Sequence, residues 1–82
     1  MPVQKDSLTE EEKAFLRNVG YRVKYFRMKS GLSQMEVAEL SGLSDSTLSH
    51  LESTNVYAVS CVALHRIAKA LDVKPEALFR FD

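Results

Sequence analysis

The stretch that decides the fold runs from Ser33 to Glu52 and reads SQMEVAELSGLSDSTLSHLE. Ser33 is a favourable helix N-cap, and Glu36, three residues later, completes a capping box. Ala38 lies within this helix and is small enough for a second helix to pack closely against it. Gly42 then ends the helix, because glycine readily adopts the left-handed backbone found at helix C-termini. The first half of the stretch therefore predicts a short helix that stops at Gly42.

The second half predicts another short helix, with Ser44 as its N-cap. Leu48 and Leu51 are spaced so that both face inward. The outward side chains of this helix are Asp45, Ser46, Thr47, Ser49 and His50. Two short helices that cross around a glycine-containing turn form a helix-turn-helix motif, here residues 33–52, whose second helix enters the major groove of DNA. We therefore expect the outward side chains, together with Ser44, to contact DNA.

The charge distribution is unusual for such a motif. Residues 30–64 contain four acidic residues and no lysine or arginine. Residues 1–29 carry seven basic and four acidic residues, residues 65–82 carry four basic and three acidic ones, and the whole chain is neutral. Most DNA-binding domains neutralise phosphates with lysine and arginine. We therefore expect any DNA binding to be weaker and less sensitive to salt than is usual.

Other groups can contact phosphates in place of cations within the motif. Helix N-termini present free backbone N–H groups, and neutral side chains such as Asn55 are common donors to phosphate oxygens. Lys29, just before the motif, and basic residues of the first helix could flank the groove. Asp45 either accepts a hydrogen bond from a cytosine amino group or only complements the helix dipole. His50 is either a pH-dependent contact or an ordinary surface residue.

Size and composition indicate one globular domain. The chain has 82 residues, 45% of them hydrophobic and 27% charged, which is typical of a soluble protein. Its single cysteine cannot form an internal disulfide, which favours a reducing compartment. The sequence contains no apolar signal region and no stretch of membrane-spanning length. We expect a cytoplasmic protein that does not associate with membranes.

The segment before the motif predicts a long helix. Residues 1–8 have the character of a flexible arm, and residues 9–82 form the single domain. Thr9 and Glu12 predict a capping box at the helix start. The apolar stripe of this helix comprises Leu16, Val19, Val23 and Phe26. Gly20 interrupts the stripe, so we expect a kink or two abutting helices there.

The segment after the motif predicts two more helices. Ser60 caps the fourth helix of the chain. Its expected core face comprises Cys61, Leu64, Ile67, Ala68 and Leu71. Pro75 suits the first position of a fifth helix over residues 76–79. No alternating strand pattern occurs in the sequence, so we predict an all-α fold of five helices.

Several of these segments resemble one known family. They are Arg27, SGLSQMEVAELSGLS from residue 30, TLSHLE, and the tail LHRIAKALDVKPEALF. The chain resembles the phage repressor/Cro type helix-turn-helix regulators, also called the xenobiotic-response-element family, over about residues 16–80. The resemblance implies a compact five-helix domain of the lambda-repressor-like DNA-binding type. It also implies an ion pair between Arg27 and Glu52, and a phosphate contact from Gln34.

The motif and the resemblance together predict a transcriptional regulator, such as a repressor. We expect it to bind double-stranded DNA at a palindromic operator as a homodimer. We expect an apolar dimer interface of Val56, Tyr57, Leu78, Phe79 and Phe81. The acidic motif leaves open an alternative, a protein-interaction module related to antirepressors or antitoxins that binds a protein partner and has little affinity for DNA.

The sequence argues against an enzyme or a metal protein. Ser49 and His50 are adjacent on one helix and point about 100° apart, so they cannot act as nucleophile and base. His65 has no cysteine or second histidine at metal-ligand spacing. Cys61 is expected to be a buried apolar residue of the fourth helix. We expect no catalytic residue, no metal site and no cofactor.

Overall fold

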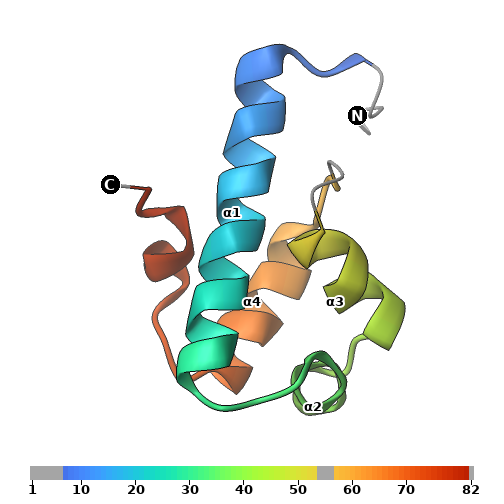
Figure 1. Cartoon of the computed structure of the whole chain (residues 1–82), viewed down its shortest axis with the longest axis vertical. Helices are drawn as coiled ribbons and strands as arrows, with labels where there is room; N and C mark the ends of the chain where they lie inside the picture. Colours follow the sequence, from blue (N-terminus) through green and yellow to red (C-terminus); the bar gives the residue numbers. More distant parts are fainter. Residues whose placement is uncertain (1–6, 54–56, 82) are drawn as a thin grey trace.

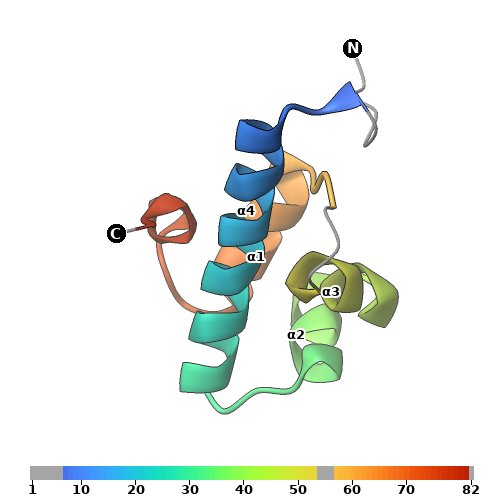
Figure 2. The same ribbon diagram turned by 45° about the horizontal axis from the view of Figure 1, so that its top comes forward.

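The computed structural model describes residues 7–53 and 57–81, which form four α-helices and one 3-10 helix. In chain order the elements are α1 (Glu10–Lys29), α2 (Gln34–Ser41), α3 (Asp45–Glu52), α4 (Cys61–Ala70) and η2 (Pro75–Phe79). α1 is the long central helix, with α2 and α3 on one side of it and η2 on the other (Figures 1 and 2). The described parts contain no strand, so the predicted compact all-α fold is confirmed.

Each α-helix begins at a side chain that the sequence identifies as its N-cap. Thr9, Ser33, Ser44 and Ser60 each accept a hydrogen bond from a backbone N–H three residues later. The capping boxes at Thr9 and Ser33 are complete, because Glu12 and Glu36 accept hydrogen bonds from the backbone N–H groups of Thr9 and Ser33 at 2.8 and 2.9 Å. These short-range predictions are confirmed.

Gly20 lies in the middle of α1, which is one continuous helix, so the expected division into two abutting helices is wrong. The reason for glycine is packing. A Cβ atom placed on Gly20 would overlap the backbone carbonyl oxygen of Leu51 in α3. The missing side chain therefore allows the backbone of α3 to approach α1 closely, at the cost of some helix propensity.

The turn between α2 and α3 has the predicted geometry. Gly42 has a φ of 71°, in the left-handed region that favours glycine, and its N–H bonds to the carbonyls of Ala38 and Glu39. Ser41 is buried at the end of α2, and its hydroxyl donates to the carbonyl of Val37 at 2.7 Å. The chain therefore leaves α2 with the Ser41 hydroxyl and the Gly42 N–H bonded, and enters α3 after three residues.

One hydrophobic core joins all the elements. It comprises Val19, Val23, Val37, Ala38, Leu48, Leu51, Leu64, Ile67, Ala68, Leu71 and Leu78. Every helix contributes to this core. Because Leu48 and Leu51 of α3 belong to it, α3 is held on its inner side and exposes its outer side.

Three predictions about the C-terminal part are wrong. The fifth helix is a 3-10 helix, a form used in short pieces because five residues cannot build a stable α-helix alone. Leu78 is fully buried in the core and is not available for a dimer interface. Cys61 is exposed because it is the first residue of α4 and precedes the buried stripe that starts at Ala63.

Some predictions fall on residues that the structure does not describe. These are residues 1–6 of the expected arm, the DNA-contact candidate Asn55 and the dimer candidate Val56. None of the helices in ranges 7–53 and 57–81 has the length and apolar character needed to cross a membrane.

Candidate nucleic-acid interface

The outer face of α3 presents four polar side chains. Asp45, Ser46, Ser49 and His50 are all exposed, and a helix of 3.6 residues per turn places them on one side, opposite Leu48 and Leu51. The side chains of Ser46 and Ser49 form no hydrogen bond with any described residue. They are therefore available to external donors and acceptors.

Two of the predicted DNA contacts also have a structural task. The Ser44 hydroxyl accepts from the N–H of Thr47 at 3.1 Å and lies 2.8 Å from the Thr47 hydroxyl. Thr47 is half-buried. Both hydroxyls hold the first turn of α3, so substitution of either residue would affect the helix as well as any DNA contact.

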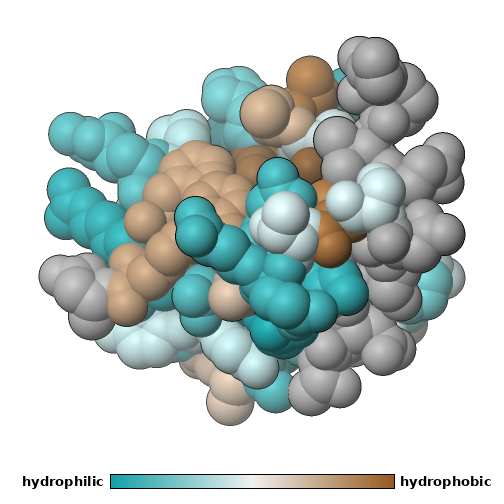
Figure 3. Space-filling model, turned by 90° about the horizontal axis from the view of Figure 1, so that it is seen from above, coloured by the Kyte–Doolittle hydropathy of each residue, from teal (hydrophilic) through white to brown (hydrophobic). Residues whose placement is uncertain are grey.

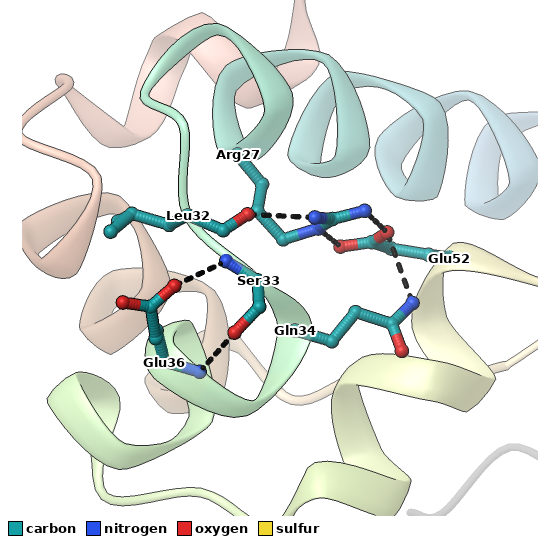
Figure 4. Close-up of polar contacts among 6 residues, drawn as sticks. All are labelled: Arg27, Leu32, Ser33, Gln34, Glu36 and Glu52. Atoms are coloured by element: carbon teal, nitrogen blue, oxygen red, sulfur yellow. Dashed lines mark hydrogen bonds and ion pairs between the residues drawn. The ribbon is translucent and has the colours of Figure 1, made fainter.

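A buried ion pair fixes the other end of α3 (Figure 4). Arg27 of α1 donates from Nε and Nη2 to the two carboxylate oxygens of Glu52, at 2.7 and 2.9 Å. Its Nη1 donates to the carbonyl of Leu32 at 2.8 Å. The Glu52 side chain is 2% exposed and the Arg27 side chain 14%, so this bidentate pair lies largely out of water. The hydrogen bond to Glu52 raises the pKa of Arg27, which stays charged.

Gln34 joins the same cluster. Its side-chain amide donates one of its two N–H groups to Oε1 of Glu52 at 3.2 Å, which orients the side chain, and the second N–H group is left for the expected phosphate contact (Figure 4). The backbone N–H groups of Gln34 and Met35, in the first turn of α2, have no partner among the described residues. A phosphate at this position could accept from these backbone groups as well as from the Gln34 amide.

The structure also shows where the acidic residues of the motif lie. Glu36 belongs to the capping box of α2, and Glu52 is neutralised by Arg27. Glu39 lies beside Leu40 on the outer side of α2. Asp45 is therefore the only carboxylate on the described outer face of α3. The surface that would meet DNA is less acidic than the sequence count suggests.

Lys29 is not beside α3. Nine residues separate it from Gly20, which at about 100° per residue puts it on the opposite face of α1. Its ammonium group lies 5.7 Å from the ring centroid of Tyr25.

The loop after α3 contributes Tyr57, whose ring centroid lies 6.0 Å from that of His50.

This geometry has a counterpart among known proteins. Residues 19–80 match the family described as helix-turn-helix domain. The chain belongs to this helix-turn-helix family.

Two solved structures are similar to this helix-turn-helix protein. The restriction-modification controller protein C.AhdI from Aeromonas hydrophila is 39% identical, with a TM-score of 0.76 over 80% of this chain and 98% of that one. The hypothetical transcription factor NHTF from Neisseria is 25% identical, with a TM-score of 0.76 over 98% of this chain and 86% of that one. None of the curated proteins matches the chain. The family and these structures identify a DNA-binding regulator and not an enzyme.

The helix-turn-helix protein also exposes an aromatic cluster away from α3. The ring of Phe15 in α1 stacks on Phe79 with centroids 5.9 Å apart and meets Phe81 edge-on at 5.5 Å. These three residues, the aromatic cluster, are each about 40% exposed. Figure 3 shows apolar surface, bordered by hydrophilic side chains, on the end of the molecule where α1 begins. Phe15 was not among the residues predicted to form an interface. In the sequence it is distinguished only as an aromatic residue outside the buried stripe of α1.

The expected dimer residues do not form one surface. Phe79 and Phe81 belong to the aromatic cluster, whereas Tyr57 contacts His50 of α3. α1 lies between η2 and the α3 side of the molecule in both ribbon views (Figures 1 and 2). Nowhere in the described ranges do three or more histidine, cysteine, aspartate or glutamate side chains gather as a metal site.

Proposed function

We propose that this protein is a sequence-specific transcriptional regulator of the phage repressor/Cro type, which binds a palindromic operator as a homodimer in the cytoplasm. The observation that carries the proposal is the outer face of α3. Its residues Asp45, Ser46, Ser49 and His50 are exposed and lie outside the hydrophobic core and the ion pairs, while a buried ion pair fixes the helix that presents them. The similarity to a restriction-modification controller and to a transcription factor supports the same role.

The chemistry of this face suits direct readout of bases. Serine hydroxyls donate and accept, so Ser46 and Ser49 can bond to base edges, and the carboxylate of Asp45 can accept from the amino group of cytosine. The first turns of α2 and α3 bring free backbone N–H groups to flanking phosphates. Occupation of a promoter by the dimer would then repress transcription by blocking access.

The proposal predicts a loss of sequence discrimination when both serines are removed. A binding site is first selected from a randomised duplex pool with the wild-type protein. The Ser46→Ala/Ser49→Ala variant should bind the selected duplex about tenfold more weakly, since two hydrogen bonds of roughly 1 kcal/mol or less each are lost. Fluorescence anisotropy measures both affinities.

A scrambled duplex of the same length is the control, and the variant should bind it as the wild type does. Unchanged affinity and selectivity in the variant would show that this face of α3 does not read bases. Failure of the wild type to enrich any sequence would favour the alternative, an interaction module of the antirepressor or antitoxin kind. The absence of lysine and arginine from residues 30–64 is the observation in favour of that alternative.

The aromatic cluster supports the homodimer. Three phenylalanine rings exposed together favour burial against a partner, and a two-fold axis covers the same patch on both subunits. Because η2 and α3 lie on opposite sides of α1, such a contact leaves both recognition helices uncovered (Figure 1). Operator half-sites would then lie roughly 34 Å apart, one turn of DNA.

Substitution in the aromatic cluster should dissociate the dimer. Sedimentation at micromolar concentration should give twice the chain mass of 9.3 kDa for the wild type and a single chain mass for Phe79→Asp. Met35→Asp is the matched control, because Met35 is also a large exposed apolar residue but lies in α2. A wild-type monomer, or a Phe79→Asp variant that remains dimeric, would contradict this interface.

A further inference from the structure

One face of α1 carries a row of basic residues. The row consists of four basic residues and one glycine. They follow one another at alternating steps of four and three and therefore share one side of the helix: Lys13, Arg17, Gly20, Lys24 and Arg27. Two members of the row show which way it faces. Gly20 abuts the carbonyl of Leu51, and Arg27 bonds to Glu52, so both meet the C-terminal end of α3. Lys24 lies between these two contacts along the helix, and Arg17 lies about one turn before Gly20 on the same side.

The basic residues on α1 differ in how they are used. On the far side of the helix, Arg22 donates to the carbonyl of Ala77 at 3.3 Å and lies over the ring of Phe26, and Lys29 lies over Tyr25. Lys13 pairs with Glu10 at 3.4 Å. By contrast, Arg17 and Lys24 form no hydrogen bond or ion pair with any residue in the described ranges. Lys24 is exposed and Arg17 is partly exposed.

We propose that Arg17 and Lys24 bind the phosphate backbone of DNA beside the groove that α3 enters. This inference rests on the proposed DNA binding. Residues 30–64, which include the motif, contain no lysine or arginine, so any cation that neutralises a DNA phosphate has to come from outside this stretch. Seven residues of helix separate Arg17 and Lys24 by roughly 10 Å along the axis, which allows each to reach a different phosphate.

The experiment compares salt dependence in two charge-matched variants. Binding to a mixed-sequence 24-base-pair duplex and to the selected duplex is measured by anisotropy from 50 to 200 mM salt. Arg17→Gln/Lys24→Gln should lose about tenfold in affinity per cation at 0.1 M salt, because affinity scales with salt to a power of about −0.9 for each phosphate contact. Its salt slope should fall by about one unit per cation, while the preference for the selected duplex stays unchanged.

The control variant is Lys69→Gln/Lys74→Gln, which removes two exposed charges around the turn between α4 and η2. It should retain the wild-type slope, as should Lys29→Gln. Thermal melting of each variant establishes that it is folded. If the double variant is not folded, the single variant Lys24→Gln, at an exposed position, is measured in its place. If the wild type binds DNA and Arg17→Gln/Lys24→Gln has the same salt slope, this inference is wrong but the proposed function stands. A wild type that binds neither duplex would overturn the proposed function as well.

Discussion

Replacing Glu52 with alanine should lower the melting temperature by more than about 10 °C. The substitution leaves the largely buried guanidinium of Arg27 without its counter-ion and removes the acceptor of Gln34. Breaking a buried pair by removing one partner costs about 3–5 kcal/mol. In a domain of this size each kcal/mol lowers the melting temperature by roughly 4–8 °C. Circular dichroism at 222 nm follows the loss of helix on heating.

Glu39→Ala is the matched control for this prediction. Glu39 is also a helical glutamate replaced by alanine, but it is exposed and forms no ion pair with a described residue. Its melting temperature should stay close to that of the wild type. Equal melting of Glu52→Ala and wild type would mean that the ion pair does not hold α1 against α3.

Replacing Gly20 with alanine should destabilise the protein, although helix propensity predicts the opposite sign. Alanine is favoured over glycine in a helix interior by about 1 kcal/mol. The new methyl group would overlap the carbonyl oxygen of Leu51, which is backbone and cannot rotate away. Overpacking of this kind typically costs 1–3 kcal/mol and is expected at or above the upper limit here, so we expect a net loss of about 2 kcal/mol.

Ala14→Gly calibrates the propensity term in the same helix. Ala14 is exposed in α1, so this reverse substitution should cost only the propensity difference of about 1 kcal/mol. Urea unfolding of both variants gives the two free energies on one scale. A Gly20→Ala variant more stable than the wild type would show that α3 does not pack against α1 at this point.

What the sequence predicts well is local. The N-caps, the capping boxes and the turn at Gly42 depend on contacts within four residues, so spacing alone identifies them. The fifth helix was misjudged because its pattern is right but its length cannot sustain an α-helix. Leu78 was misjudged because the sequence gives no sign of which apolar residue of η2 points into the core.

The position of the cations depends on tertiary packing. The sequence places Lys29 nearest to the motif, yet the helix turns it away from α3 and brings Lys24 to that side. The contacts of Gly20 with Leu51 and of Arg27 with Glu52 show which face of α1 adjoins α3. In the same way, periodicity alone does not show that the hydroxyls of Ser44 and Thr47 lie 2.8 Å apart. A pattern of residue types does not show which face of a helix packs against which neighbouring helix.

The residues that hold α3 in place are different from the residues that it exposes to solvent. Its inner residues and Glu52 hold the helix, whereas Asp45, Ser46, Ser49 and His50 take no part in the described core or ion pairs. Exposed positions of this kind tolerate substitution within about 0.5 kcal/mol. Under the proposed function, new operator preferences would therefore arise by mutation at these four sites without passing through unstable intermediates. The same four codons define a compact library in which nearly every member should fold, and in which selection acts on specificity alone.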